Sequence, residues 1–275
     1  MTTTPFTTTP VSIPFAAPPH QNAIRYAARD VVTLARRNLL ALIRVPTALV
    51  FMVIQPVMFV LLFRYIFQAL GAFTHGDYVN FLVPGILVQT VIFGAVGTAI
   101  GLAEDLQRGL IERFKALPMA RMAVLAGRTL ADSARNVIVL IIITGVGYLV
   151  GFRPHGGFFD YIAGSLVMLL FAYCLSWGFA FVGLAAPNSE TAQAMTFPLI
   201  FPLTFASTIF IPLAYLPGWL QGFARNQPVS EVARAVRALM TGSSAGNSIW
   251  VSLLWSVGLV AVLAPLAVNK FRKIA

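Results

Sequence analysis

Residues 78–102 read YVNFLVPGILVQTVIFGAVGTAIGL, an apolar run without a charged side chain. A helix needs about 20 such residues to cross the hydrocarbon core of a bilayer, so this stretch predicts a membrane-spanning helix. The whole chain of 275 residues has the same character, with 58% hydrophobic residues, 10% charged residues and a mean hydropathy of +0.83. These values exclude an ordinary soluble domain and predict an integral membrane protein.

Similar apolar runs follow one another along the chain. They predict an all-α integral membrane protein with six transmembrane helices, at residues 46–67, 78–102, 132–152, 161–187, 191–211 and 249–268. The third run is uninterrupted only from Val137 onward, so we expect the turn with Asp132 and Arg135 to lie at the membrane interface or against protein. Asp160 and Glu190 also fall at boundaries, which leaves no acidic side chain in the middle of a predicted span.

The basic residues indicate how these spans are oriented. The formal charge of +10 is not gathered into one patch, as a nucleic-acid site would require, but is spread over the ends of the apolar runs. Most Lys and Arg residues precede the first span, lie between the second and third, or follow the sixth, and cytoplasmic flanks collect such residues. We therefore expect both termini to be cytoplasmic, in the plasma membrane of a bacterial cell. Residues 1–22, rich in Thr and Pro, predict a disordered cytosolic tail without the pattern of a signal peptide.

Two cytoplasmic segments have helical amphipathic patterns. Residues 24–44 place basic residues on one side of a helix and aliphatic residues on the other, which predicts an N-terminal interfacial helix at the inner leaflet. Its basic side carries Arg25, Arg29, Arg36 and Arg37. The alternative is that this segment simply extends the first span.

Residues 103–117 form the second segment, which begins at the end of the second predicted span. Leu106, Leu110 and Leu117 fall on one face of a helix, which predicts an amphipathic helix able to dock a soluble partner. Its charged residues are Glu104, Asp105, Arg108, Glu112, Arg113 and Lys115. The alternative is a solvated loop that only fixes the topology.

The region between the fifth and sixth spans, residues 217–241, is expected to lie on the outer side. Leu216, Pro217 and Gly218 predict a turn into a short amphipathic piece, and a second helix follows, with Ser230 as its N-cap and Gly242 as its end. These patterns favour two short re-entrant helices. A plain extracellular loop with a hydrophobic anchor is the alternative.

Signatures of catalysis are missing from the sequence. No Gly-rich turn ends in Gly-Lys-Ser or Gly-Lys-Thr, so the chain has no P-loop of its own. The three His residues are far apart in the sequence, and the single Cys174 lies in an apolar run, so we assign no catalytic residue and no metal site. Neutral side chains within the predicted spans are the candidates for a substrate pathway, with ordinary packing as the alternative for each. They are Gln55, Met58, Phe59, Gln89, Ser176 and Thr204.

Two segments resemble a known family. Residues 108–118, RGLIERFKALP, are followed by Arg121 and by GRTLAD at residues 127–132, and LPGWL at residues 216–220 is followed by NQPV at residues 226–229. In this order and between these spans, they resemble the membrane (permease) subunits of ABC type-2 exporters, particularly the daunorubicin-resistance type of drug and lipid transporters. The resemblance extends from about residue 24 to the C-terminus.

The resemblance implies an ATP-driven exporter in which a separate cytosolic ATPase dimer grips two permease copies, as a homodimer or a paralogous heterodimer. The interfacial helix and residues 103–117 would contact the ATPase, which would hold the ATP and Mg, and this chain would bind no cofactor. Trp219 and Phe223 on the outer helices would belong to an outer gate. The expected substrate is an amphipathic or hydrophobic drug, lipid or glycolipid. A secondary multidrug or lipid carrier and a polysaccharide-exporting permease are the alternatives.

Overall fold

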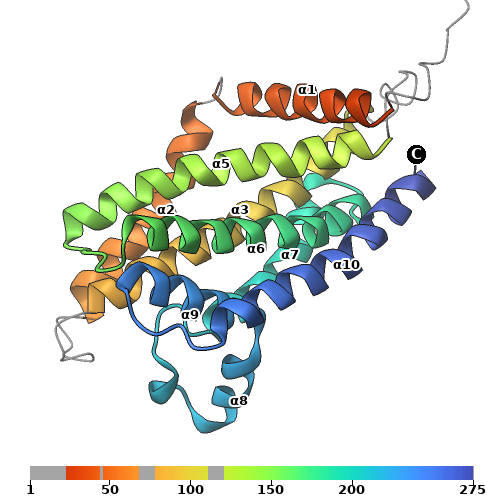
Figure 1. Cartoon of the computed structure of the whole chain (residues 1–275). Coiled ribbons are helices and arrows are strands. Elements are labelled where there is room, and N and C mark those ends of the chain that lie inside the picture. The colour runs from red at the N-terminus through yellow and green to blue at the C-terminus, as the bar shows by residue number, and fades with distance from the viewer. Residues whose placement is uncertain (1–22, 44–45, 68–77, 111–120, 275) are drawn as a thin grey trace, which may run out of the picture.

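The computed structural model describes residues 23–43, 46–67, 78–110 and 121–274 (Figure 1). This part of the chain is helical and contains no strand. Within it, four helices are long and apolar enough to cross a membrane. They are α3 (Tyr78–Gln107), α5 (Arg121–Val150), α6 (Phe158–Ala185) and α10 (Ser248–Ile274). The predicted all-helical fold is therefore confirmed for the described residues, with four helices that could span a membrane.

Two shorter helices coincide with the remaining apolar runs. Helix α2 (Pro46–Leu62) continues into a π-helical turn, η2 (Phe63–Phe67), and the two together cover the first predicted span. Helix α7 (Ser189–Phe205) begins near the predicted start of the fifth span but ends before residue 211. It contains Pro198 and Pro202, which lack the N–H group that continues a helix. Residues 206–211 are mostly apolar, so hydropathy extended the predicted span past Phe205, the residue at which the helix ends.

Two helices extend further into charged sequence than hydropathy predicts. Helix α5 begins at Arg121 and not near residue 132, and α3 runs without a break past residue 102 to Gln107. The segment expected as a separate docking helix thus begins as the last turn of α3, which ends in a turn at Gly109 with a φ of 64°. Residues 111–120 lie outside the described residues. The extensions occur because the charged side chains form ion pairs with one another, which hydropathy does not represent.

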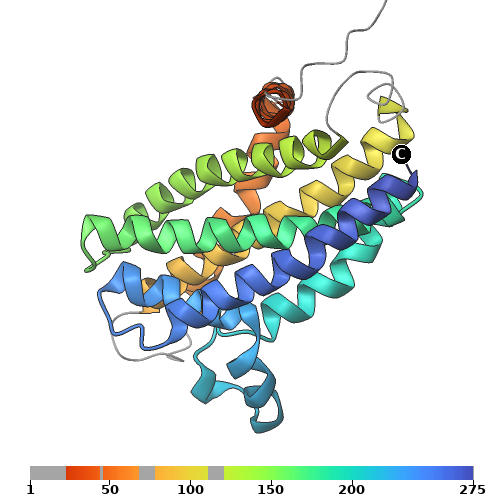
Figure 2. The ribbon, with the colours of Figure 1, turned by 45° about the vertical axis from the view of Figure 1, so that its right-hand side comes forward.

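Helix α1 (Ala23–Ile43) lies across one end of the bundle and packs on α5 (Figures 1 and 2). Leu34 and Ala35 are buried, and Gly127 of α5 lets the two helices approach so closely that an added Cβ would lie 2.7 Å from the Cβ of Leu34. Arg36 and Arg37 remain exposed. Among the side chains of α1 that the structure describes, buried apolar residues therefore cover protein and the basic residues are exposed.

The segment expected on the outer side contains η3 (Leu213–Tyr215), α8 (Gly218–Asn226) and α9 (Pro228–Thr241). Helix α9 is buried among α3, α6 and α10, with Val232 and Val236 fully enclosed. Its predicted end is confirmed, because Gly242 is the C-cap residue with a φ of 69°. The predicted N-cap is wrong: Gln227 is the cap and Pro228 the first helical residue, a position where proline loses no hydrogen bond.

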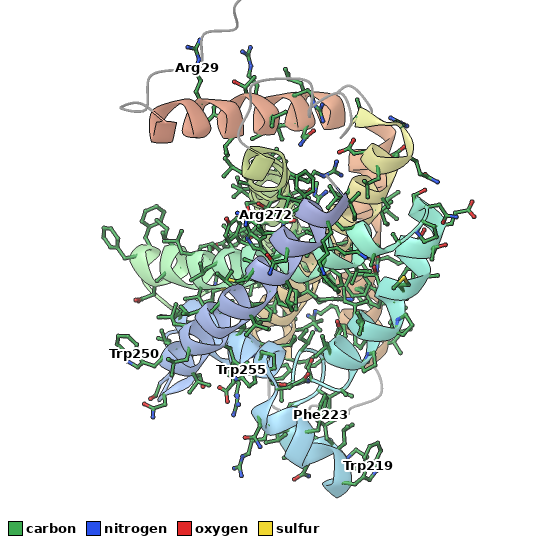
Figure 3. The ribbon with its side chains drawn as sticks, turned by 90° about the vertical axis from the view of Figure 1, so that its right-hand side faces the viewer. Arg29, Trp219, Phe223, Trp250, Trp255 and Arg272 are labelled. Atoms are coloured by element: carbon green, nitrogen blue, oxygen red, sulfur yellow. The ribbon has the colours of Figure 1, made fainter. Side chains whose placement is uncertain are left out.

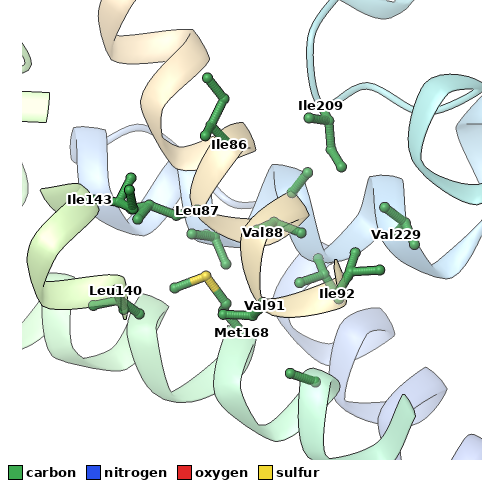
Figure 4. Close-up of a cluster of buried hydrophobic side chains, with 14 of the residues drawn as sticks. Ile86, Leu87, Val88, Val91, Ile92, Leu140, Ile143, Met168, Ile209 and Val229 are labelled. Atoms are coloured by element: carbon green, nitrogen blue, oxygen red, sulfur yellow. The ribbon is translucent and has the colours of Figure 1, made fainter. Parts of the chain in front are cut away.

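Helix α3 is the centre of the bundle and contacts α5, α6, α7 and α9. Within its buried cluster, Leu87 lies beside Ile143 of α5 and Val91 beside Met168 of α6 (Figure 4). Because lipid tails are as apolar as these side chains, such close packing is what holds helices together in a membrane. The polar residues of α3 are therefore exceptions within a dry core, and they mark the candidate site.

Candidate functional site

A central pocket of about 200 Å³ opens beside α3, between α2, α5 and α7. Its aromatic walls are Phe59 of α2, Phe93 of α3 and Phe197 of α7. Its polar groups are Gln55, Gln89, Thr90, Arg135 and Asn136. Apolar walls with a few fixed polar groups are typical of sites that bind amphipathic small molecules.

Gln89 is the least satisfied of these polar groups. Its side chain is only 2% exposed, and its Oε1 atom has no hydrogen-bond partner in the described part of the chain. A buried amide oxygen without a donor costs about 1–3 kcal/mol of stability. A ligand or a water that donates a hydrogen bond in the central pocket would remove this cost.

Asn136 and Arg135 connect the pocket to a row of buried charges between α3 and α5, which we call the polar seam. Its members are Asp105 and Thr98 of α3 and Arg128, Asp132 and Arg135 of α5. Asp132 is central: its Oδ1 lies 2.9 Å from Nη1 of Arg135, and its Oδ2 accepts a hydrogen bond of 2.5 Å from the Thr98 hydroxyl. Nη1 of Arg128 lies 3.3 Å from Oδ2 of Asp105. Two guanidinium groups thus face two carboxylates, and the seam is neutral.

Glycines of α3 make room for this seam. An added Cβ at Gly97 would lie 2.8 Å from Nη1 of Arg135, and one at Gly101 would overlap the guanidinium of Arg128. The exposed backbone also supplies acceptors, because Arg128 donates to the Gly97 carbonyl over 3.3 Å and Arg135 donates to the Gly94 carbonyl. Carbonyls and carboxylates together satisfy the buried guanidinium groups, as buried charges require.

The seam ends where α3 leaves the bundle. Asp105 is within the electrostatic reach of Arg37 on α1 as well as of Arg128. One residue earlier, Glu104 forms an exposed ion pair of 2.5 Å with Arg108. The central pocket is therefore joined by continuous polar contacts to the end of the bundle that α1 covers.

Only some of the pathway residues predicted from the sequence line the central pocket in the structure. Gln55, Phe59 and Gln89 line the central pocket. Met58 is 55% exposed on α2, and Ser176 is buried on α6, where it donates to the Ala172 carbonyl. Thr204 is buried on α7, and its hydroxyl has no partner among the described residues. The last three do not line the central pocket.

The residues predicted to dock a partner differ in how exposed their side chains are. Glu104 and Arg108 are accessible at the end of α3, whereas the carboxylate of Asp105 is largely buried in the polar seam. Glu112, Arg113 and Lys115 lie outside the described residues. On α1, the side chains of Arg29, Arg36 and Arg37 are exposed, and that of Arg25 lies outside the described side chains.

The predicted gate residues Trp219 and Phe223 are exposed on α8, at the opposite end of the molecule from Arg29 (Figure 3). They do not contribute to the central pocket. Their position at the end away from α1 is the one that an outer segment would occupy.

The arrangement of the seam residues was not predicted from the sequence. Asp132 and Arg135 are 4% and 6% exposed and pack against α3, which is the second of the two positions expected for them, against protein. The sequence did contain a pattern that indicates this packing. Residues 128, 132 and 135 share one face of α5, and Gly94, Gly97 and Gly101 share one face of α3. Nothing in one sequence paired the two faces.

Comparison with known proteins agrees with this architecture. The sequence profile of the family described as ABC-2 type transporter matches residues 29–241. The chain is 35% identical over 246 residues to the daunorubicin resistance ABC transporter permease protein DrrB1 of Streptomyces coeruleorubidus, covering 90% of this chain and 87% of the relative. It is 27% identical to the probable doxorubicin resistance ABC transporter permease protein DrrC of Mycobacterium tuberculosis, covering 94% of each chain.

A more distant relative is the putative transport permease ycf38 of Cyanophora paradoxa, which is 26% identical over 78% of this chain and 76% of its own length. The helices that line the central pocket and the polar seam all fall within the matched residues 29–241. The profile match, together with the relative that is 35% identical, shows that this chain belongs to the ABC-2 type transporter family of membrane permeases.

Proposed function

We propose that this chain is the permease subunit of an ATP-driven exporter that moves an amphipathic or hydrophobic substrate out of the cytoplasm. The observation that carries the proposal is the central pocket, which joins aromatic walls to buried polar groups within membrane helices. A volume of about 200 Å³ in one chain suits part of a drug, lipid or glycolipid. The names of the relatives favour a drug as the substrate.

The energy would come from a separate ATPase that holds the ATP and Mg. Two ATPase copies would each grip one permease, and the permease would form a homodimer or a heterodimer with a paralogue. The docking surface would comprise the exposed Glu104 and Arg108, the basic face of α1 and the segment with Glu112, Arg113 and Lys115. This chain would then act without catalysing a reaction.

The polar seam gives a route for the coupling. ATP-driven closure of the ATPases would shift the end of α3, and Asp105, Arg128, Asp132 and Arg135 would carry the shift to the central pocket. A partner can move the equilibrium between inward-open and outward-open states only if it interacts differently with the two. The seam supplies such contacts, because the ion pair between Arg128 and Asp105 and the hydrogen bond from Thr98 to Asp132 both join α5 to α3, and packed helices of this kind can slide.

This function requires six spans, with α2 and α7 crossing the membrane in addition to the four longer helices. Pairing Pro46–Leu62 with the turn Phe63–Phe67 lengthens α2 toward the required span. Both termini would be cytoplasmic in the plasma membrane of a bacterium, with α1 at the inner interface and α8 and α9 as short outer helices. Arg29 and Trp219 lie at opposite ends of the molecule, as this orientation demands (Figure 3).

Co-purification with an ATPase tests the coupling. The proposal expects a P-loop ATPase to be encoded in a neighbouring gene. The chain should copurify with that ATPase, and ATP turnover of the reconstituted complex should respond to substrate. Reversing two charges, Glu112→Lys with Arg113→Glu, should weaken both complex formation and transport. Arg225→Glu, an exposed reversal on α8, is the matched control and should change neither. Unchanged complex formation and transport in the double variant would refute this docking surface.

Transport by pocket variants tests the site itself. Phe93→Ala removes one aromatic wall of the central pocket and should raise the substrate concentration needed for half-maximal transport about tenfold, the value of one lost aromatic contact. Phe158→Ala, at a side chain that is 74% exposed, is the control. Equal transport by both variants would place the substrate elsewhere.

A further inference from the structure

A second pocket lies at the end of the bundle away from the C-terminus, where the start of α3, the connection from α5 to α6 and the end of α9 meet (Figure 1). It has a volume of about 340 Å³, and we call it the outer pocket. Its lining residues are Asn80, Phe81, His155, Arg237, Thr241 and Ser243. Five of the six are polar, one is a cation, and none is acidic.

Arg237 is the deepest of these groups, and its charge is not balanced. Its Nε donates to the Phe81 carbonyl over 2.9 Å, and its Nη2 donates to the Thr208 and Ile209 carbonyls over 3.0 and 3.3 Å. Its guanidinium carbon lies 3.5 Å from the centre of the Phe81 ring. In the described part of the chain no carboxylate forms an ion pair with it, and the nearby charge of Arg234 is also positive.

The carbonyl contacts show that Arg237 fastens α9 to α3, but they use only two of its three nitrogen atoms. Nη1 makes no hydrogen bond to the described residues. A partly buried cation near a membrane is costly unless an anion or further acceptors complete its shell. The outer pocket beside it offers a place for that anion.

The remaining lining groups suit an anion with several oxygen atoms. Asn80 accepts a hydrogen bond of 2.9 Å from the Arg153 backbone through its Oδ1 atom, which leaves its amide NH₂ free to donate. The Thr241 hydroxyl donates to the Arg237 carbonyl over 2.8 Å, and the exposed Ser243 hydroxyl 3.1 Å from it can turn its proton toward a ligand. Arginine with neighbouring amide and hydroxyl donors is a recurring arrangement for phosphate.

The surroundings indicate where such a phosphate would come from. Phe158 and Phe159 follow His155 closely in the sequence and are 74% and 83% exposed. Exposed aromatic side chains at the ends of membrane helices lie at the level of the lipid headgroups. The outer pocket would therefore open at the depth of phospholipid phosphates.

We propose that the outer pocket binds a phosphate group, supplied by a phospholipid of the outer leaflet, with Arg237 as its principal ligand. The bound lipid would join α3 to α9 from outside, in addition to the carbonyl contacts. This binding is independent of ATP and of the central pocket, so it can be measured on the isolated full-length chain.

Lipid binding by Asn80→Asp tests the proposal. This substitution preserves the oxygen that accepts from Arg153, but it places a carboxylate beside Arg237, which would repel phosphate. Native mass spectrometry with phosphatidylglycerol and with diacylglycerol of the same acyl chains should show at least about tenfold preference for the phospholipid in the unmodified chain. Asn80→Asp should lose that preference. Asn226→Asp, the same change on an exposed residue of α8, should retain it.

Arg237 itself gives a second comparison. Arg237→Gln should abolish the preference and Arg237→Lys should retain part of it, because lysine keeps the charge without the planar fork. Millimolar inorganic phosphate distinguishes the source: displacement of the lipid shows that free phosphate shares the site, whereas no displacement shows that the lipid form is required, and both support a phosphate site. Equal binding of phosphatidylglycerol and diacylglycerol, or equal loss in Asn80→Asp and Asn226→Asp, would overturn the proposal.

Discussion

The ion pair between Asp132 and Arg135 should show strong energetic coupling, because the polar seam is buried and its charges are balanced. Arg128 and Arg135 face Asp105 and Asp132. Asp132→Asn leaves one uncompensated positive charge inside the bundle, and Arg135→Gln leaves one uncompensated negative charge. The double variant keeps the ion pair between Arg128 and Asp105 and is neutral again.

The expected magnitudes follow from the contacts that survive each change. Removing one partner of a buried ion pair costs about 3–5 kcal/mol. In Asp132→Asn the new amide oxygen would still accept from the Thr98 hydroxyl, and the guanidinium of Arg135 would still donate to the Gly94 carbonyl. We therefore expect each single variant to lose about 2–3 kcal/mol of unfolding free energy, and the double variant about the same as one single, which gives a coupling of about 2–3 kcal/mol.

The assay is the free energy of unfolding in mixed micelles, measured by titration with sodium dodecyl sulfate. Glu104→Gln and Arg108→Gln give the matched cycle at an exposed ion pair, whose side chains are 44% and 66% exposed. That pair should show a coupling of no more than about 0.5 kcal/mol. If the losses at Asp132 and Arg135 added up within about 0.5 kcal/mol, the two groups would not form the buried pair described here, and the argument for the seam would fail.

Three further predictions concern single positions. Gly101→Ala should cost about 1–3 kcal/mol of unfolding free energy, since its Cβ would overlap the guanidinium of Arg128. Gly145→Ala, where an added Cβ has nothing within 4 Å, should instead stabilise α5 by about 0.5–1 kcal/mol. Equal effects of the two substitutions in thermal denaturation would contradict the glycine packing. Gly242→Ala should cost about 1 kcal/mol, because the end of α9 holds this residue at a φ of 69°, and an unchanged melting temperature would be inconsistent with that cap. Gln89→Leu should not destabilise the protein, since it removes an unpaired buried oxygen worth about 1–3 kcal/mol, yet it should impair transport; a large drop in melting temperature would mean that Gln89 has a partner.

The helices were predictable where a run of apolar residues defines them. Each of the six apolar runs coincides with a helix, because a backbone in an apolar environment must satisfy its hydrogen bonds internally. The ends were predicted less well. Helix α3 continues to Gln107 and α5 starts at Arg121, where charged residues are compensated by contacts between the two helices. Hydropathy treats each charge as isolated and therefore ends a helix too early.

The site was predictable only in its neutral part. Gln55, Phe59 and Gln89 were found because a polar or aromatic residue inside an apolar run is conspicuous by itself. Asp132 and Arg135 pair with each other along α5, but their contacts with Thr98 and Gly94 of α3 are not determined by one sequence. A small-residue face on one helix and a charged face on another could have been matched by shape. That match needs the three-dimensional arrangement, in which α3 is central.

The two deepest guanidinium groups differ in how their charge is balanced, and this difference separates a coupling element from a binding site. Arg135 has the Asp132 carboxylate at 2.9 Å on its own helix and donates to the Gly94 carbonyl of α3, so its charge is balanced without any ligand, and its contact with α3 changes when α3 and α5 move relative to each other. Arg237 has three carbonyls and an aromatic ring but no acidic partner in the described chain, so an added anion would still lower its free energy. Reorganisation between conformations is therefore expected at the first and ligand binding at the second.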